Sequence, residues 1–105
     1  MVKFLETKAD FDAALSAAAG KLMVVDFTAS WCGPCKMIAP VFEGLSQEHA
    51  DVDFYKVDVD ANADTSESQG ISCMPTFKLY KNGEVVDTLE GADKDKLKAL
   101  IVSNK

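Results

Sequence analysis

The feature that most constrains this chain is a short apolar run that contains a single carboxylate. Residues 22–27 read Leu-Met-Val-Val-Asp-Phe, with large or β-branched side chains on both sides of Asp26. A nearly continuous apolar run of this length is typical of a strand that is buried on both faces of a sheet. The run therefore predicts a buried central strand.

The first half of the chain predicts a strand and two helices around this run. Residues 2–6 favour a strand, and Thr7 is placed to cap the next helix, which Gly20 is suited to end. A second helix is expected to start near Pro34, and Pro40 inside it should bend it. The side chains that we expect to face the core are Phe11, Ala14, Leu15 and Ala18 in the first helix, and Met37, Ile38, Val41, Phe42 and Leu45 in the second.

The second half predicts a strand over residues 52–59, a short helix over 62–69 that ends at Gly70, and then a hairpin. Residues 76–81 and 84–91 flank Asn82-Gly83, a dipeptide that favours a hairpin because a type I′ turn needs positive φ at both central positions. A helix over residues 93–103 closes the chain, with Leu97, Leu100 and Ile101 facing inward. The order βαβαβα and then ββα predicts an α/β fold with a mixed sheet, in which crossover helices join parallel strands before an antiparallel hairpin.

Length and charge restrict the functions. A chain of 105 residues predicts one domain over residues 1–105. Seventeen Asp and Glu residues against eleven lysines, with no arginine, give a net charge of −6. Phosphate backbones and anionic membranes favour cationic faces, so we expect no nucleic-acid and no membrane partner. No apolar run is long enough to span a bilayer and the N-terminal residues lack a signal pattern, which favours a cytoplasmic location.

A pair of cysteines carries the chemistry. The run Trp-Cys-Gly-Pro-Cys-Lys at residues 31–36 comes directly after the predicted central strand and opens the next helix. Two cysteines at this spacing can close a small disulfide ring with little backbone movement. Cys32 would lie at the helix N-terminus, where free N–H groups and the helix dipole should lower the pKa of its thiol. Cys35 should be more buried, which predicts that Cys32 attacks and Cys35 resolves.

The alternative interpretation of the cysteine pair is half of a zinc site. A structural zinc ion takes four ligands, usually from two close pairs. Only Cys73 and His49 remain to complete the set, and they form no second pair. We therefore expect no metal.

The chain resembles the thioredoxin family, and in particular its eukaryotic cytosolic members, which share the Cys-Met-Pro-Thr of residues 73–76. The resemblance implies the thioredoxin fold, a central five-stranded mixed sheet flanked by four helices, with the first strand at one edge and the hairpin at the other. The matching residues extend along the whole chain: Asp26-Phe27, residues 31–36, Pro40, Met74-Pro75-Thr76 and Gly91-Ala92.

This resemblance implies a protein-disulfide reductase that works by dithiol–disulfide exchange. Cys32 would attack a disulfide of a client protein, and Cys35 would release the reduced client, which leaves a Cys32–Cys35 disulfide. An NADPH-dependent thioredoxin reductase would restore the dithiol, and no cofactor would bind the chain itself. We expect a monomer. An oxidising or isomerase-like protein is disfavoured by Pro34, while a redox-gated binding module stays open as an alternative.

Two residues outside the cysteine pair are candidates for proton transfer. A carboxylate within the apolar run is costly to bury and should be protonated or paired. Strand alternation and the neighbouring strands of the family fold let Asp26 and Lys56 meet beneath the active site. We expect burial to raise the pKa of Asp26, so that it accepts the Cys35 proton through water. Lys56 is either its partner or an ordinary surface lysine.

The resemblance also implies a docking surface. Pro75 resembles the proline that the family holds in cis opposite the disulfide, although an ordinary trans turn proline is the alternative. A cis bond would turn the Met74 backbone toward an extended substrate segment. Gly33 and Pro34 would tune the redox potential. The residues implied for substrate binding are Trp31, Met74, Pro75, Thr76, Gly91 and Ala92.

Cys73 is the third thiol, and it is either a spectator or a regulatory group. If it is exposed beside Met74, it can be glutathionylated or nitrosylated, or it can link two chains when oxidised.

Overall fold

The computed structural model describes residues 2–105, which form a five-stranded sheet in the order β1-β3-β2-β4-β5. β1, β3 and β2 are parallel, whereas β4 is antiparallel to β2 and β5 to β4. The predicted mixed sheet, with the first strand at one edge and the hairpin at the other, is therefore confirmed. The elements are β1 (Lys3–Phe4), α1 (Lys8–Ala18), β2 (Met23–Thr28), α2 (Gly33–Glu48), β3 (Asp53–Asp58), α3 (Ala63–Ser68), β4 (Thr76–Lys81), β5 (Glu84–Glu90) and α4 (Lys94–Asn104).

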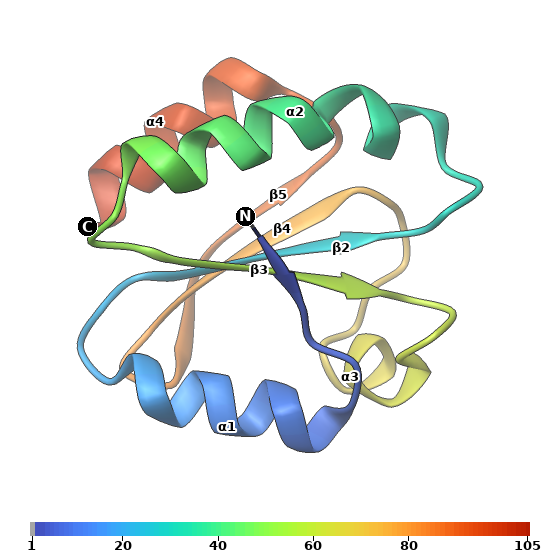
Figure 1. Cartoon of the computed structure of the whole chain (residues 1–105), viewed down its shortest axis with the longest axis horizontal. Helices are drawn as coiled ribbons and strands as arrows, with labels where there is room; N and C mark the ends of the chain where they lie inside the picture. The colour runs from blue at the N-terminus through green and yellow to red at the C-terminus, as the bar shows by residue number, and fades with distance from the viewer. Residues whose placement is uncertain (1) are drawn as a thin grey trace.

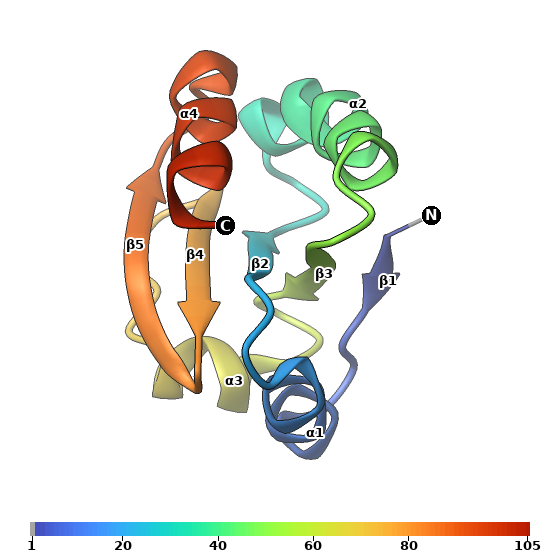
Figure 2. The same ribbon diagram turned by 90° about the vertical axis from the view of Figure 1, so that its left-hand side faces the viewer.

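The helices cover both faces of the sheet. α2 and α4 lie over one face and α1 and α3 over the other, as Figures 1 and 2 show. β2 is the central strand, and its side chains alternate between the two resulting cores. Val24 packs in the core beneath α2 and α4, while Met23 and Val25 pack in the core on the α1 side. This two-sided burial explains why the run around Asp26 is almost continuously apolar.

The end of the first helix and the length of the first strand differ in detail from the prediction. α1 ends at Ala18 with Ala19 as its C-cap, so Gly20 follows the helix as predicted, but the positive φ of 50° is that of Ala19. The Ala19 carbonyl accepts a hydrogen bond from the Asn82 N–H at 3.3 Å, which joins the end of α1 to the β4–β5 turn. β1 covers only Lys3–Phe4 of the predicted residues 2–6 and pairs with β3 at the edge of the sheet.

The predicted core-facing side of α2 is partly wrong. Met37 is 79% exposed, and Val41 is only half-buried. Ile38, Phe42 and Leu45 occupy the centre of the buried face, and Met37 lies about 100° around the helix from Ile38. Leu15 and Leu100 are likewise half-buried, whereas the other predicted core residues of α1 and α4 are buried.

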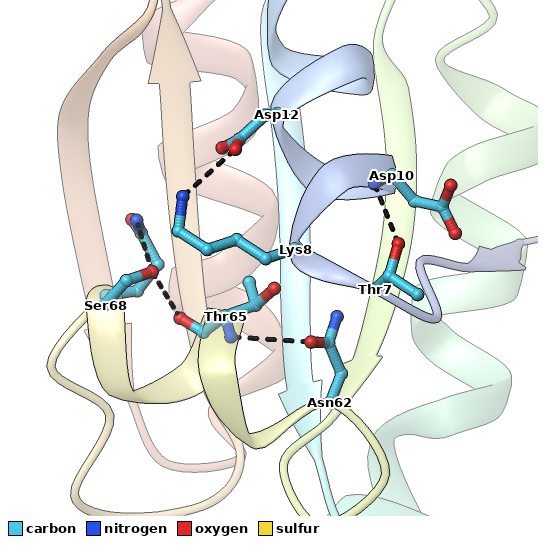
Figure 3. A network of polar contacts seen from close by, with 8 residues as sticks. Thr7, Lys8, Asp10, Asp12, Asn62, Thr65 and Ser68 are labelled. Atoms are coloured by element: carbon cyan, nitrogen blue, oxygen red, sulfur yellow. Dashed lines mark hydrogen bonds and ion pairs between the residues drawn. The ribbon is translucent and has the colours of Figure 1, made fainter.

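Side chains cap the starts of α1 and α3, and the first of these caps, Thr7, is the one that the sequence predicts. The Thr7 Oγ1 accepts from the Asp10 N–H at 3.1 Å, and the Asn62 Oδ1 accepts from the Thr65 N–H at 3.4 Å (Figure 3). Asn62 is buried and also donates to the Leu5 carbonyl at 3.0 Å. It therefore anchors α3 to the end of β1.

Asn82 and Gly83 both have positive φ, which confirms the hairpin turn. Within residues 2–105, no helix is long and apolar enough to cross a membrane.

Candidate functional site

Cys32 and Cys35 form a disulfide at the start of α2, directly beyond the carboxyl end of β2. Their Cα atoms lie 5.3 Å apart. Both side chains are buried, Cys32 at 5% exposure and Cys35 at 2%, in a small cluster with Ala29. Cys35 is thus the less exposed of the two, in the direction that the sequence predicts.

Cys32 is the N-cap residue of α2. Its Sγ accepts a hydrogen bond from the Cys35 N–H at 3.2 Å, and Pro34 occupies the first turn of the helix. In the reduced protein this N–H and the positive end of the helix dipole would stabilise a thiolate at Cys32. A nucleophile is therefore favoured at Cys32 rather than at Cys35.

The loop before β4 closes over the disulfide. The Cys32 Sγ lies 3.7 Å from the Met74 carbonyl oxygen, and the bond from Met74 to Pro75 is cis. The Pro75 carbonyl accepts from the Gly91 N–H at 2.9 Å, so the loop is joined to the end of β5. Gly91 has φ of 104°, a conformation that favours glycine. These contacts bring residues 32, 74, 75 and 91 together.

The other predicted residues around the disulfide differ in exposure. Gly33, Pro34 and Ala92 are exposed, and Met74 is half-buried. Thr76 is buried instead, and its hydroxyl donates to the Cys73 carbonyl at 2.7 Å. Cys73 is half-buried, with its Sγ 3.7 Å from the Thr76 Oγ1.

Trp31 lies at the rim, where its side chain is 65% exposed. Its indole Nε1 donates to the Asp60 carboxylate at 2.8 Å. The sequence reasoning missed Asp60 as a member of the site. Asp60 follows β3 directly, and the carboxyl ends of the parallel strands β2 and β3 lie at the same edge of the sheet. The position of Asp60 after β3 therefore indicates from the sequence that it lies near the cysteine pair, which follows β2.

Asp26 lies on the face of β2 that is covered by α2 and α4. It is 1% exposed, and neither carboxylate oxygen accepts a hydrogen bond from any residue in the described part of the chain. Burial raises the pKa of Asp26 to about 7, and the positive charge of Lys56 acts in the opposite direction. Lys56 is paired with Asp26 in the β2–β3 register and is half-buried, so the two positions are neighbours on adjacent strands.

The described residues hold no cluster suited to a metal ion. Across residues 2–105, no three His, Cys, Asp or Glu side chains gather in a way that could bind one.

A reversible disulfide at the start of a helix, on a sheet of this order, defines a thiol–disulfide oxidoreductase. Comparison with known proteins gives the family. The thioredoxin family model matches residues 2–103. The chain belongs to the thioredoxin family.

Its relatives match over nearly their full length. The chain is 55% identical to thioredoxin of Geodia cydonium, covering all of both chains, and 50% identical to thioredoxin of Homo sapiens, covering 96% of each. Among solved structures, Fasciola hepatica thioredoxin superposes with a TM-score of 0.97 at 42% identity, with 99% of this chain and all of the other covered. Plasmodium falciparum thioredoxin gives 0.94 at 47% identity, with the same coverage.

Proposed function

We propose that this protein is a general protein-disulfide reductase in which Cys32 attacks and Cys35 resolves. The observation that carries the proposal is the position of Cys32 as the N-cap of α2, with the Cys35 N–H directed at its Sγ. The Cys32 thiolate forms a bond to one sulfur of the client disulfide, and the other client sulfur leaves as a thiolate. The Cys35 thiolate then attacks Cys32 and displaces the first client sulfur. Two electrons pass to the client, and the two released thiolates take up protons.

Resolution needs a base for the Cys35 proton, and we assign this role to Asp26. A carboxyl group with a pKa of about 7 is partly ionised at neutral pH and can both accept and return a proton. Lys56 acts as a positioning residue, because its charge favours the ionised form of Asp26.

The client would bind across the surface that surrounds the disulfide. Trp31, Pro34 and Ala92 offer exposed contacts, and the Met74 backbone lies beside the Cys32 sulfur. Gly33 and Pro34 would set the redox potential together with the helix N-terminus. The buried hydroxyl of Thr76 would support the Cys73–Pro75 segment from below.

The proposal extends to the partners and the setting. A thioredoxin reductase that uses NADPH would regenerate the dithiol, and disulfide-containing proteins would be the clients. The protein would act in the cytoplasm as a monomeric single domain without a bound cofactor. Cys73 would link two chains only under oxidation.

The test is NADPH oxidation in the presence of a thioredoxin reductase and a disulfide-bonded protein substrate. We expect turnover that is lost in Cys32→Ser. If turnover is absent, the assay is repeated with dithiothreitol as the electron donor. Activity with dithiothreitol alone would reject the chosen reductase as a partner, and inactivity with both donors would reject the reductase function in favour of a redox-gated binding module.

A further inference from the structure

Phe4, Lys56 and Asp26 lie in one row across three neighbouring strands of the sheet. Phe4 of β1 is the register partner of Lys56 in β3, and Lys56 is in turn the partner of Asp26 in β2. Register partners on parallel strands direct their side chains to the same face of the sheet. The Lys56 side chain therefore lies between an aromatic ring at the edge of the sheet and a carboxyl group at its centre. Figure 2 shows the three strands side by side.

The Lys56 ammonium group lies at the aromatic end of this row. Its Nζ is 5.7 Å from the centre of the Phe4 ring. This distance is within the range of a cation–π interaction, which is attractive even where the ring is partly exposed, as the 45% exposed Phe4 is. At the other end of the row, neither Asp26 oxygen accepts a hydrogen bond from any side chain or backbone group of residues 2–105. The ammonium group thus lies over the ring and makes no hydrogen bond to the carboxylate.

Lys56 is the charged group on which the ionisation of Asp26 depends. Its positive charge lowers the pKa of Asp26, while burial raises this pKa by more. The other ionisable side chains around this row are Glu6 beyond β1, Asp58 in β3, and Glu43 and Cys35 in α2, while β4 and α4 contribute apolar side chains. None of these four side chains carries a positive charge. The position of one ammonium group therefore decides how strongly the ionised form of Asp26 is stabilised.

We propose that Phe4 is a positioning residue for the resolution step. Its ring holds the Lys56 ammonium group at the edge of the sheet, so that Asp26 is not fixed in an ion pair and keeps its affinity for the Cys35 proton. A carboxylate that is paired with an ammonium group is a weaker base, because the cation stabilises the ionised form. This inference rests on the proposed base role of Asp26 and names a residue outside the active site that sets the strength of that base.

The first measurement is the titration of Asp26 by carbon-13 NMR in the oxidised protein, where the disulfide prevents titration of Cys32 and Cys35. The protein is labelled at the side-chain carboxyl carbon of aspartate, and the Asp26 signal is the one that is missing in Asp26→Ala. In Phe4→Leu the ammonium group is free to approach the carboxylate. We expect the midpoint of the Asp26 titration to fall by about one pH unit from its wild-type value.

Further variants show whether Phe4 acts through Lys56. Phe4→Trp keeps an aromatic face for the ammonium group, so its midpoint should stay at the wild-type value. In Lys56→Met the midpoint should rise, because the charge that favours ionised Asp26 is removed. The addition of Phe4→Leu to Lys56→Met should then change nothing. Lys3→Met is the matched control, because Lys3 is the register partner of Tyr55, which packs in the core on the α1 side, and its midpoint should not move.

The rate of resolution connects this titration with the reaction. Phe4→Leu should resolve the mixed disulfide about threefold faster than the wild type at pH 6, because a larger fraction of Asp26 is ionised at that pH. Above pH 8, where Asp26 is ionised in both proteins, this advantage should be lost. Rapid-quench single-turnover experiments over this pH range measure the rate.

The outcomes separate this inference from the function on which it rests. A midpoint in Phe4→Leu that stays at the wild-type value or rises would overturn the role of Phe4. A fall of equal size in the Lys56→Met background would also overturn it, because the ring would then act by excluding water and not by holding the ammonium group. A fall that needs Lys56, but that the pH dependence of resolution does not follow, would contradict the base role of Asp26 and with it any role of Phe4 in resolution.

Discussion

Asp26 of β2 and Lys56 of β3 are register partners in the parallel part of the sheet, yet their surroundings differ. Asp26 is fully enclosed, whereas Lys56 is half-buried and places its Nζ 5.7 Å from the centre of the Phe4 ring. Burial raises the pKa of Asp26 more than the charge of Lys56 lowers it. The carboxyl group is therefore poised to exchange a proton near neutral pH, beneath the helix that carries the disulfide.

Replacement of this carboxyl group should affect one chemical step. In Asp26→Ala, resolution of the mixed disulfide should slow by about 100-fold, because Cys35 loses its proton acceptor. The first attack by Cys32 should change little. Rapid-quench single-turnover experiments with mass detection of the mixed disulfide measure both steps. Equal slowing of the two steps would contradict the assignment.

The pH dependence of resolution gives an independent readout. A base with a pKa of about 7 must be ionised to act, so resolution in the wild type should accelerate as the pH rises through 7. Asp26→Asn should lack this inflection. Its persistence in Asp26→Asn would mean that another group is the base.

Asp26 should also make stability depend on pH. The carboxyl group ionises near pH 3.8 in the unfolded chain but only near pH 7 in the folded protein. Between these values the folded state binds more protons, so the free energy of unfolding falls as the pH rises. Above pH 7, the ionised and buried Asp26 lowers the free energy of unfolding by up to about 4 kcal/mol. Urea unfolding of the oxidised protein measures this effect. The free energy of unfolding of Asp26→Asn, relative to that of the wild type, should rise by about this amount between pH 4 and pH 8. A difference in the free energy of unfolding that stays constant over this pH range would contradict the burial of an ionisable Asp26.

Asn62 should matter more for stability than the other side-chain cap in Figure 3. Asn62→Ala removes the cap of α3 and leaves the Leu5 carbonyl without its donor, at a cost of about 2–3 kcal/mol. Thr7→Ala removes only an exposed cap of α1 and should cost about 1 kcal/mol. Urea unfolding gives the free energy of unfolding of both variants. An equal loss of this free energy in the two variants would show that the hydrogen bond from Asn62 to the Leu5 carbonyl contributes little.

Oxidation tests the third thiol. Cys73 is half-buried beside Thr76, while Cys32 and Cys35 pair with each other. The thiol oxidant diamide should therefore give a dimer on a non-reducing gel that is absent in Cys73→Ser. A dimer that persists in Cys73→Ser, or no dimer at all, would argue against the proposed role of Cys73.

The sequence predicted the features that depend on local pattern. The element order is a consequence of periodicity, and the apolar flanks of Asp26 correctly indicated its burial. The position of Cys32 at a helix start could be inferred from the adjacent strand and Pro34. These features depend on residues that are close in the chain.

The features that the sequence did not predict depend on contacts between distant segments. The hydrogen bond from the Trp31 indole to the Asp60 carboxylate joins two loops. The hydrogen bond from the Asn62 side chain to the Leu5 carbonyl joins the start of α3 to the end of β1. Helical spacing alone is compatible with a core position for Met37, but the sheet covers only part of the α2 surface and Met37 is exposed.

The most direct test of the account is to locate the mixed disulfide. Reduced Cys35→Ser is mixed with a disulfide-bonded protein substrate, and the adduct is mapped by peptide mass spectrometry. We expect a stable adduct at Cys32, and none in Cys32→Ser under the same conditions. An adduct at Cys73, or formation of an adduct in Cys32→Ser at the wild-type rate, would contradict the central claim that the N-cap cysteine of α2 is the nucleophile.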